Sequence, residues 1–145
     1  MAASRARLSL VTLGVGDVRR ATAFYTSLGF DRSSVSVEGE VSFFRMAGSV
    51  LAVWGMDAMA ADVGVTPEGT GFQAHALAMN FDSEADVDAA FDQWATAGAT
   101  VVKLPEHTSW GGYTGYVADL DGHLWELAYN PGFAFTADGQ LDLPD

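Results

Sequence analysis

Glu126 is the side chain whose position most strongly indicates chemistry. It lies in the apolar run 124–129, where a carboxylate is rare unless it is solvated or lines a cavity. A carboxylate in such a cavity can transfer protons as an acid or base, or anchor a cationic ligand. Tyr113, Tyr116 and His75 are the side chains that could assist it. The candidate catalytic residues are therefore Glu126, Tyr113 and His75.

A β-hairpin is expected to position Glu126. The apolar run 116–118 leads into Asp119-Leu120-Asp121-Gly122, and a second run then ends at Asn130-Pro131. Asp-Gly between two apolar runs is a strong turn signal, because glycine adopts the positive φ of a tight reversal. Glu126 should therefore lie on the returning strand.

An internal repeat organises the rest of the chain. Helical spacing of apolar residues predicts two helices, which Asp17 and Ser83 cap and which Gly29 and Gly98 end. Each helix follows one apolar run and precedes three. The expected strands are 8–15, 35–37, 41–46 and 50–54, then 72–81, 100–103 and the two strands of the hairpin.

The repeat predicts an α+β fold in a single domain, residues 1–145. Two tandem β-α-β-β-β modules, about 8–55 and 72–130, can lay their sheets edge to edge as a cupped eight-stranded mixed sheet around a cleft. Residues 56–71 are rich in glycine and proline and are interpreted as a linker with at most one helical turn, and residues 131–145 form a C-terminal tail outside the repeat.

The run Tyr-Val-Ala-Asp-Leu-Asp-Gly-His-Leu-Trp-Glu-Leu, residues 116–127, resembles the closing strands of the vicinal oxygen chelate superfamily. That group includes glyoxalase I, extradiol dioxygenases, fosfomycin-resistance enzymes and bleomycin-resistance proteins. The resemblance covers roughly residues 8–131 and implies the same paired modules. It indicates a fold more than a function, because the superfamily hosts unlike chemistries.

The resemblance also implies four metal-ligand positions, of which only one is filled by a donor. In the metal-dependent relatives the residue at the place of Glu126 is the last ligand, whereas the other three positions here are Leu10, Ala52 and Ala76. We expect no tightly bound metal cofactor; the alternative is a divalent metal held by Glu126 with His75. His75 is one residue from the expected position, and such a slip reverses the face of a strand unless a bulge intervenes.

Apolar and aromatic residues are expected in the cleft in place of the metal ligands. Period-two alternation places several of the former ligand positions on one inner face with Thr12, Trp54 and Ala128. Trp110 stands beside two glycines, and two tryptophans at one cleft would favour an aromatic ligand. Arg45 is either an ion partner of Glu126 or an ordinary surface residue. The predicted ligand-binding residues are Leu10, Thr12, Arg45, Ala52, Trp54, Ala76, Trp110, Tyr113 and Glu126.

Composition limits the partners. The net charge of −12 repels nucleic acid and attracts cations, and the absence of cysteine excludes disulfides and thiol chemistry. No apolar run approaches the ~20 residues of a membrane span, and the N-terminus lacks a signal-peptide core, so a cytoplasmic location without membrane contact is expected. The resemblance implies a homodimer, for which Phe133 and Phe135 in the tail offer apolar surface.

Two functions fit these observations. The first is a binding protein of the bleomycin-resistance kind, which holds a small aromatic or cationic molecule in its cleft without a tightly bound metal. The alternative is a lyase, isomerase or dioxygenase-like enzyme that uses Glu126, with or without a divalent metal. The sequence leaves open whether the protein is an enzyme.

Overall fold

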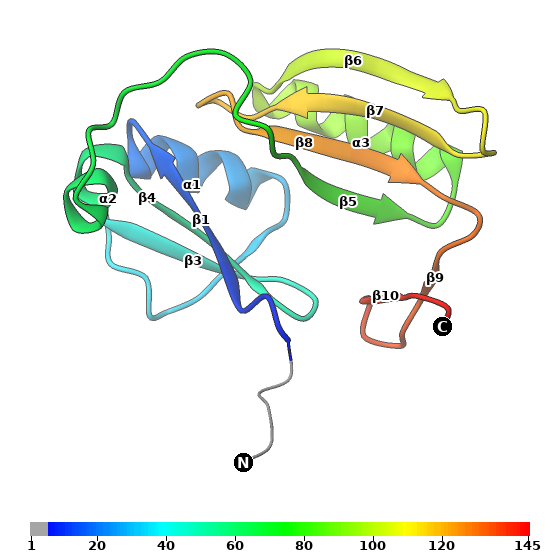
Figure 1. The fold of residues 1–145 in the computed structure, drawn as a ribbon, viewed down its shortest axis with the longest axis horizontal. Helices are drawn as coiled ribbons and strands as arrows, with labels where there is room; N and C mark the ends of the chain where they lie inside the picture. Colours follow the sequence, from blue (N-terminus) through cyan, green and yellow to red (C-terminus); the bar gives the residue numbers. More distant parts are fainter. Residues whose placement is uncertain (1–5) are drawn as a thin grey trace.

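Two β-α-β-β-β modules follow one another in the computed structural model, which describes residues 6–145 (Figure 1). The first module contains β1 (Leu10–Val15), α1 (Val18–Ser27), β2 (Asp31–Arg32), β3 (Val41–Arg45) and β4 (Val50–Gly55). The second contains β5 (Leu77–Phe81), α3 (Glu84–Ala97), β6 (Thr100–His107), β7 (Tyr113–Ala118) and β8 (Leu124–Tyr129). Helix α2 (Met56–Val63) joins the modules, and β9 (Ala134–Phe135) and β10 (Leu141–Asp142) form a hairpin in the tail. The predicted α+β repeat is confirmed.

Each module forms its own mixed four-stranded sheet. The strand orders are β1-β4-β3-β2 and β5-β8-β7-β6, with β1 parallel to β4 and β5 parallel to β8. The remaining neighbours in both sheets are antiparallel. The two halves therefore share one topology, although within the described residues their strands pair as two sheets and not as one continuous sheet of eight.

One hydrophobic core serves both modules. Helices α1 and α3 each cover one face of their own sheet, and the rings of Tyr25 on α1 and Trp94 on α3 lie edge to face with centroids 6.4 Å apart. Trp125 of β8 joins them, 5.4 Å from Trp94. Tyr25 and Trp94 occupy equivalent positions of the repeat, and both are buried. The repeat therefore supplies the contact that holds its two copies together.

The turn before β8 contributes a buried polar contact to that core. The carboxylate of Asp119 accepts hydrogen bonds from the backbone N–H groups of Asp121 and His123, both at 2.9 Å. It also accepts one from the hydroxyl of Tyr25 at 2.5 Å, and the same hydroxyl accepts a bond from the indole N–H of Trp125 at 3.1 Å. This carboxylate therefore links the β7–β8 turn to α1 of the other module.

Two further contacts tie this turn to the end of β1 and to the loop that follows it. Asp121 accepts a hydrogen bond from the backbone N–H of Gly16 at 2.9 Å. The Nε2 atom of His123 lies 2.8 Å from the carbonyl oxygen of Gly14. Both contacts therefore join the second module to the first.

Tyr25 should make the fold less stable as the pH rises into the alkaline range. Burial, with the neighbouring charge of Asp119, raises the pKa of Tyr25 above its ordinary value of 10.0. Both states hold the phenol proton below pH ~10, whereas above it only the unfolded chain releases the proton. The free energy of unfolding should therefore fall above pH ~10, by up to about 1.4 kcal/mol per pH unit from this residue.

Tyr25→Phe isolates that contribution. Urea unfolding at several pH values between 8 and 11 should give the variant a shallower alkaline loss of stability, by about one proton. The other tyrosines are unchanged, so the difference between the two slopes belongs to Tyr25. Equal slopes would contradict the assignment.

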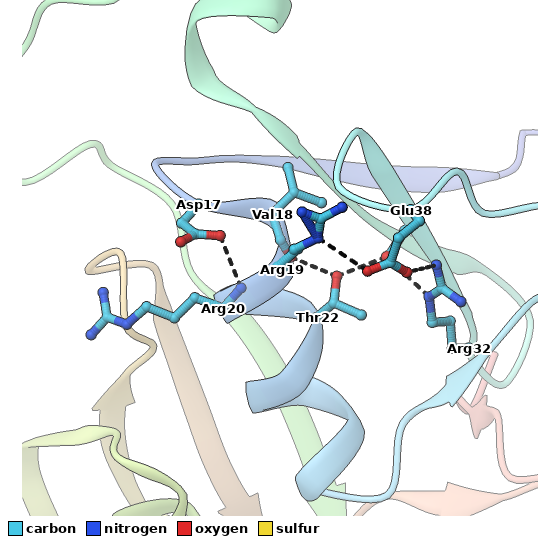
Figure 2. Close-up of polar contacts among 8 residues, drawn as sticks. Asp17, Val18, Arg19, Arg20, Thr22, Arg32 and Glu38 are labelled. Atoms are coloured by element: carbon cyan, nitrogen blue, oxygen red, sulfur yellow. Dashed lines mark hydrogen bonds and ion pairs between the residues drawn. The ribbon is translucent and has the colours of Figure 1, made fainter.

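The sequence-predicted strand at 35–37 is a loop. Strand β2 comes earlier and is shorter, and Val37 forms only an isolated bridge with Val41 across the turn at Gly39, whose φ is +74°. Figure 2 shows that the guanidinium groups of Arg19 and Arg32 both reach Glu38 of this loop, at 3.3 and 3.4 Å. These largely exposed ion pairs connect the loop to α1 and β2.

The linker and the tail also differ from expectation. α2 is a helix of eight residues, longer than the single turn predicted, and β5 begins only at Leu77. Phe72, expected in that strand, is 74% exposed. The tail hairpin packs on its own chain, because a side chain at Gly48 would lie 2.8 Å from Gln140 and one at Gly139 would lie 3.8 Å from Ala47. The tail therefore contacts the β3–β4 turn, which reduces the surface that it was expected to offer to a second copy.

Candidate functional site

Strand β8 presents Glu126 on the face of its sheet that points away from α3. Alternation along the strand buries Trp125 and Leu127 in the core and turns Glu126 to the opposite side. We call the face of each sheet opposite α1 or α3 the inner face. In register with Glu126 on this face stand Tyr116 of β7 and Ala78 of β5.

A hydrogen bond couples Glu126 to Tyr116. The hydroxyl of Tyr116 donates to Oε2 of Glu126 at 2.6 Å, and both side chains are half-buried. The bond and partial desolvation raise the pKa of Tyr116, since losing its proton would leave two anions in contact. The pair fixes the carboxylate in one orientation, and Oε1 makes no hydrogen bond to another described residue. It can therefore accept a hydrogen bond from a ligand or exchange a proton with one.

The first module assembles its predicted residues on the inner face of the other sheet. Thr12 stands opposite Ala52 in the β1–β4 register, and Leu10 and Trp54 belong to the pairs two positions away on either side. Leu13 and its neighbours of opposite parity lie in the core instead. Leu10, Thr12, Ala52 and Trp54 therefore share one face, as alternation predicts. Ala52 is buried, whereas Leu10 is 45% exposed.

Tyr113 lies on the wrong face to join Glu126. It stands opposite Tyr129 in the β7–β8 register, on the α3 side of the sheet. Its hydroxyl donates to Asp88 of α3 at 2.7 Å, and this bond raises the pKa of Tyr113. Tyr113 and Tyr116 are three residues apart, so alternation sends them to opposite faces. The structure therefore gives Tyr113 a contact with α3 in place of the predicted role in the cleft.

Arg45 does not pair with Glu126. Its guanidinium lies 3.2 Å from the carboxylate of Asp31, its neighbour in the β2–β3 register, and both side chains are largely exposed. Of the two readings of Arg45, the structure supports the surface residue. The contact is local, because a carboxylate on the adjacent strand is nearer than one in the other module.

Ala76 and His75 precede the strand in which they were expected. Both are exposed, and β5 begins one residue after Ala76. The Nδ1 atom of His75 lies 3.2 Å from the carbonyl oxygen of Gln73, and Ala74 between them has a φ of +60°. This bend interrupts the extended backbone, so strand alternation does not govern where His75 points.

Trp110 lies against the glycine that precedes β7. A side chain built on Gly112 would meet the indole ring of Trp110 at 2.0 Å, so the ring occupies that direction. Gly112 alternates with Tyr113, which places this direction on the same side of the sheet as Tyr116. The indole is 57% exposed and available to a ligand. The glycine permits a close approach, as the sequence indicates, but the approaching group is the chain's own tryptophan.

The donor set does not fit a divalent metal. Leu10, Ala52 and Ala76 carry no donor atom, and Glu126 is engaged by Tyr116. Within residues 6–145 no group of three or more His, Cys, Asp or Glu side chains is placed to hold an ion. One carboxylate and water bind a catalytic ion only weakly, so no step of the chemistry below passes through a metal.

The inner face also contains residues that the sequence analysis did not name. Only strand register identifies them, because none stands out by type. They are Phe43 beside Ala52, Ala78 beside Glu126, and Asn80 and Thr114 on either side of Ala128. The hydroxyl of Thr114 is buried and has no hydrogen-bond partner among the described residues.

The membrane expectation can be compared with the described helices. None of them is long and apolar enough to cross a bilayer.

Solved structures share this fold. A glyoxalase-related enzyme from Fulvimarina pelagi is 34% identical, with a TM-score of 0.86 over 96% of this chain and 99% of that chain. A glyoxalase/bleomycin resistance protein/dioxygenase family enzyme from Burkholderia phytofirmans PsJN is 21% identical, with a TM-score of 0.77 over 86% and 98% of the two chains. Lactoylglutathione lyase from Agrobacterium tumefaciens is 19% identical, with a TM-score of 0.67 over 88% and 96%.

Curated relatives match a shorter segment. An uncharacterised protein of Mycobacterium bovis is 52% identical over 42 residues, which make up 29% of this chain and 28% of that protein. An uncharacterised protein of Mycobacterium tuberculosis matches equally over 25% of its length. The match therefore spans little more than a quarter of these relatives.

The family model described as the Glyoxalase/Bleomycin resistance protein/Dioxygenase superfamily matches residues 7–127, which include both modules and Glu126. The resemblance of residues 116–127 is thereby confirmed, and the chain belongs to the glyoxalase/bleomycin resistance protein/dioxygenase superfamily.

Proposed function

We propose that this protein binds a small cationic or aromatic molecule on the inner face around Glu126, without a tightly bound metal. The observation that carries the proposal is the Glu126–Tyr116 pair, an oriented carboxylate on a half-buried surface. Its strand neighbours Ala78 and Ala128 are small, which leaves room beside the carboxylate.

Charge and aromatic surface support a cationic, ring-bearing ligand. The net charge of −12 raises the local concentration of cations near the protein. The exposed indole of Trp110 offers a face on the same side of the sheet, where it can stack on a ring or contact a cation. A ligand amine or amidinium would then donate to Oε1 of Glu126 while Tyr116 holds Oε2.

Glu126→Gln tests the proposal, because the substitution keeps the shape and removes the charge. We expect affinity for thioflavin T, a cationic aromatic dye, to fall several-fold in fluorescence titrations, while the free energy of unfolding holds or rises. Glu40→Gln, an exposed site on the β2–β3 loop, is the matched control for net charge and should bind as wild type. Equal affinity of wild type and Glu126→Gln, or an equal loss in both variants, would refute the proposal.

Elemental analysis tests the proposed independence from metal. We expect the purified protein to contain well under one equivalent of transition metal, and a chelator to leave the melting temperature unchanged. A stoichiometric ion that survives dialysis would contradict this part of the proposal and leave the Glu126 test standing.

The Tyr116–Glu126 bond of 2.6 Å also favours a second function, a lyase, isomerase or dioxygenase-like enzyme in which Glu126 acts as acid or base. The similar protein from Fulvimarina pelagi is described as a glyoxalase-related enzyme. Native mass spectrometry of the purified protein would identify a copurifying molecule. Its chemical conversion by wild type, abolished in Glu126→Gln, would support the enzyme, whereas unchanged release would support the binding protein.

A further inference from the structure

A chamber lies where the C-terminal hairpin meets both modules. Its volume is about 640 Å³, within the ~300–1,000 Å³ of small-molecule sites. Four segments line it, namely residues 6–8 before β1, the β3–β4 turn at 46–49, residues 78–80 of β5, and the hairpin residues 135 and 139–141. Figure 1 shows the β9–β10 hairpin near the end of the molecule at which β1 begins. The hairpin lies outside residues 7–127, so the family model does not include this wall.

Hydrogen bonds within the hairpin stabilise its turn. The Thr136 hydroxyl donates to Asp138 at 2.6 Å, and the Gln140 amide donates to the same carboxylate at 3.1 Å. These bonds lower the pKa of Asp138, which keeps the turn acceptor ionised. The backbone N–H of Thr136 also donates to the Gln140 carbonyl at 2.8 Å. Gln140 also lies directly against Gly48, so the hairpin contacts the first module.

The lining selects for an apolar body. Met46 and Met79, which also pack against the core, line it from the two modules, Phe135 lines it from the hairpin, and Leu8 and Leu141 complete the apolar surface. Methionine adapts its shape to flat rings and makes favourable sulfur–aromatic contacts. These residues suit a ring system more than a sugar or a hydrated ion.

The charge of the lining is opposite to that of the protein. Arg7 is the one charged side chain among the described residues that line the chamber, whereas the whole chain carries 19 acidic and 7 basic residues. The other polar side chains of the lining, Ser49, Asn80 and Gln140, are neutral. The lining therefore offers an anionic ligand one guanidinium group and no carboxylate that would repel it. Guanidinium groups bind carboxylates and sulfonates with two parallel hydrogen bonds.

We propose that this chamber is a second ligand site, which takes a small aromatic molecule bearing one carboxylate or sulfonate group. The rings lie between Met46, Met79 and Phe135, and the anionic group contacts Arg7. The proposal does not rest on the function proposed for Glu126, because Glu126 does not line the chamber and selects the opposite charge; Ala78, its register neighbour, borders both sites.

Two dyes of nearly equal shape test the proposal. 8-Anilino-1-naphthalenesulfonate carries the anion, and N-phenyl-1-naphthylamine is the same ring system without it. Titrations at about 0.15 M salt, where the Debye length is ~8 Å, reduce long-range repulsion by the acidic chain. We expect Arg7→Gln to lower the affinity for the sulfonate dye about tenfold and the affinity for the neutral dye less than twofold. Phe135→Ala should weaken both dyes.

Matched controls separate the chamber from nonspecific binding. Arg20→Gln removes the same charge from an exposed position on α1. Phe133→Ala removes an aromatic ring of the tail that does not line the chamber. Both variants should bind the two dyes as wild type does. Sulfonate-dye binding that is insensitive to Arg7→Gln, or equally sensitive to Arg20→Gln, would overturn the proposal. Glu126→Gln should not weaken binding of the sulfonate dye, because it removes a negative charge, so the two proposed sites can fail separately.

Discussion

Replacing Asp119 with alanine is expected to lower the free energy of unfolding by about 3–5 kcal/mol. The carboxylate is 5% exposed and accepts three hydrogen bonds, from Tyr25 and from two backbone N–H groups. Hydrogen bonds to a charged group are worth about 1.5–3 kcal/mol each, and part of this is offset because alanine does not need to desolvate a charge. The loss also leaves two turn N–H groups without acceptors.

Urea unfolding of wild type and two variants checks this expectation. Asp121→Ala is the matched control, because Asp121 is exposed in the same turn and accepts one bond from Gly16. It should cost no more than about 1 kcal/mol. A double-mutant cycle with Tyr25→Phe should show coupling between Tyr25 and Asp119 and none between Tyr25 and Asp121. A loss below 1 kcal/mol for Asp119→Ala would show that the turn is held by other contacts.

The sequence is informative about Asp119 as a turn residue and silent about its partner. Asp-Gly in the turn, the helix caps and the matching apolar runs are local signals, and they recur in the structure except for the run 35–37, which is a loop. The bond to Tyr25 joins positions in two modules, and no local pattern encodes which residue of α1 reaches the turn. Local propensity therefore predicts the elements, and packing between the modules decides the long-range contacts.

The residues of the candidate site also fall into those that local patterns place correctly and those that they do not. Alternation places Leu10, Thr12, Ala52 and Trp54 on one face because β1 and β4 are regular. It fails at His75, where a positive φ precedes the strand. The pattern of apolar residues in a strand cannot show such a bend, since neither the residue types nor their spacing change there.

Tyr113 and Arg45 illustrate a second limit. Their partners depend on which residues of neighbouring elements lie within reach of the ends of β7 and β3, and the sequence does not fix this. Tyr113 donates a hydrogen bond to Asp88, and Arg45 forms an ion pair with Asp31. Both contacts lie outside the predicted cleft. Edge and end residues are therefore the least predictable part of a site on a sheet.

Gly115 is expected to be the most sensitive glycine of the second sheet. A β-carbon there would lie 2.5 Å from the carbonyl oxygen of Lys103, 2.8 Å from the nitrogen of Pro105 and 2.7 Å from the ring of Phe91. Register shifts of β6 against β7 on either side of Lys103 bring this backbone close. Two of the three contacts are backbone atoms, so side-chain rotation cannot relieve them.

Gly115→Ala should therefore lower the free energy of unfolding by about 3 kcal/mol, at the upper end of overpacking costs. Gly16→Ala is the matched control, because a β-carbon there meets its nearest neighbour, Asp121, at an ordinary 3.6 Å and keeps its own N–H bond. It should change stability by less than 1 kcal/mol. Urea unfolding of both variants decides the matter: equal effects would mean that β6 can move away from β7, and the irregular pairing would then be a flexible edge and not a packed one.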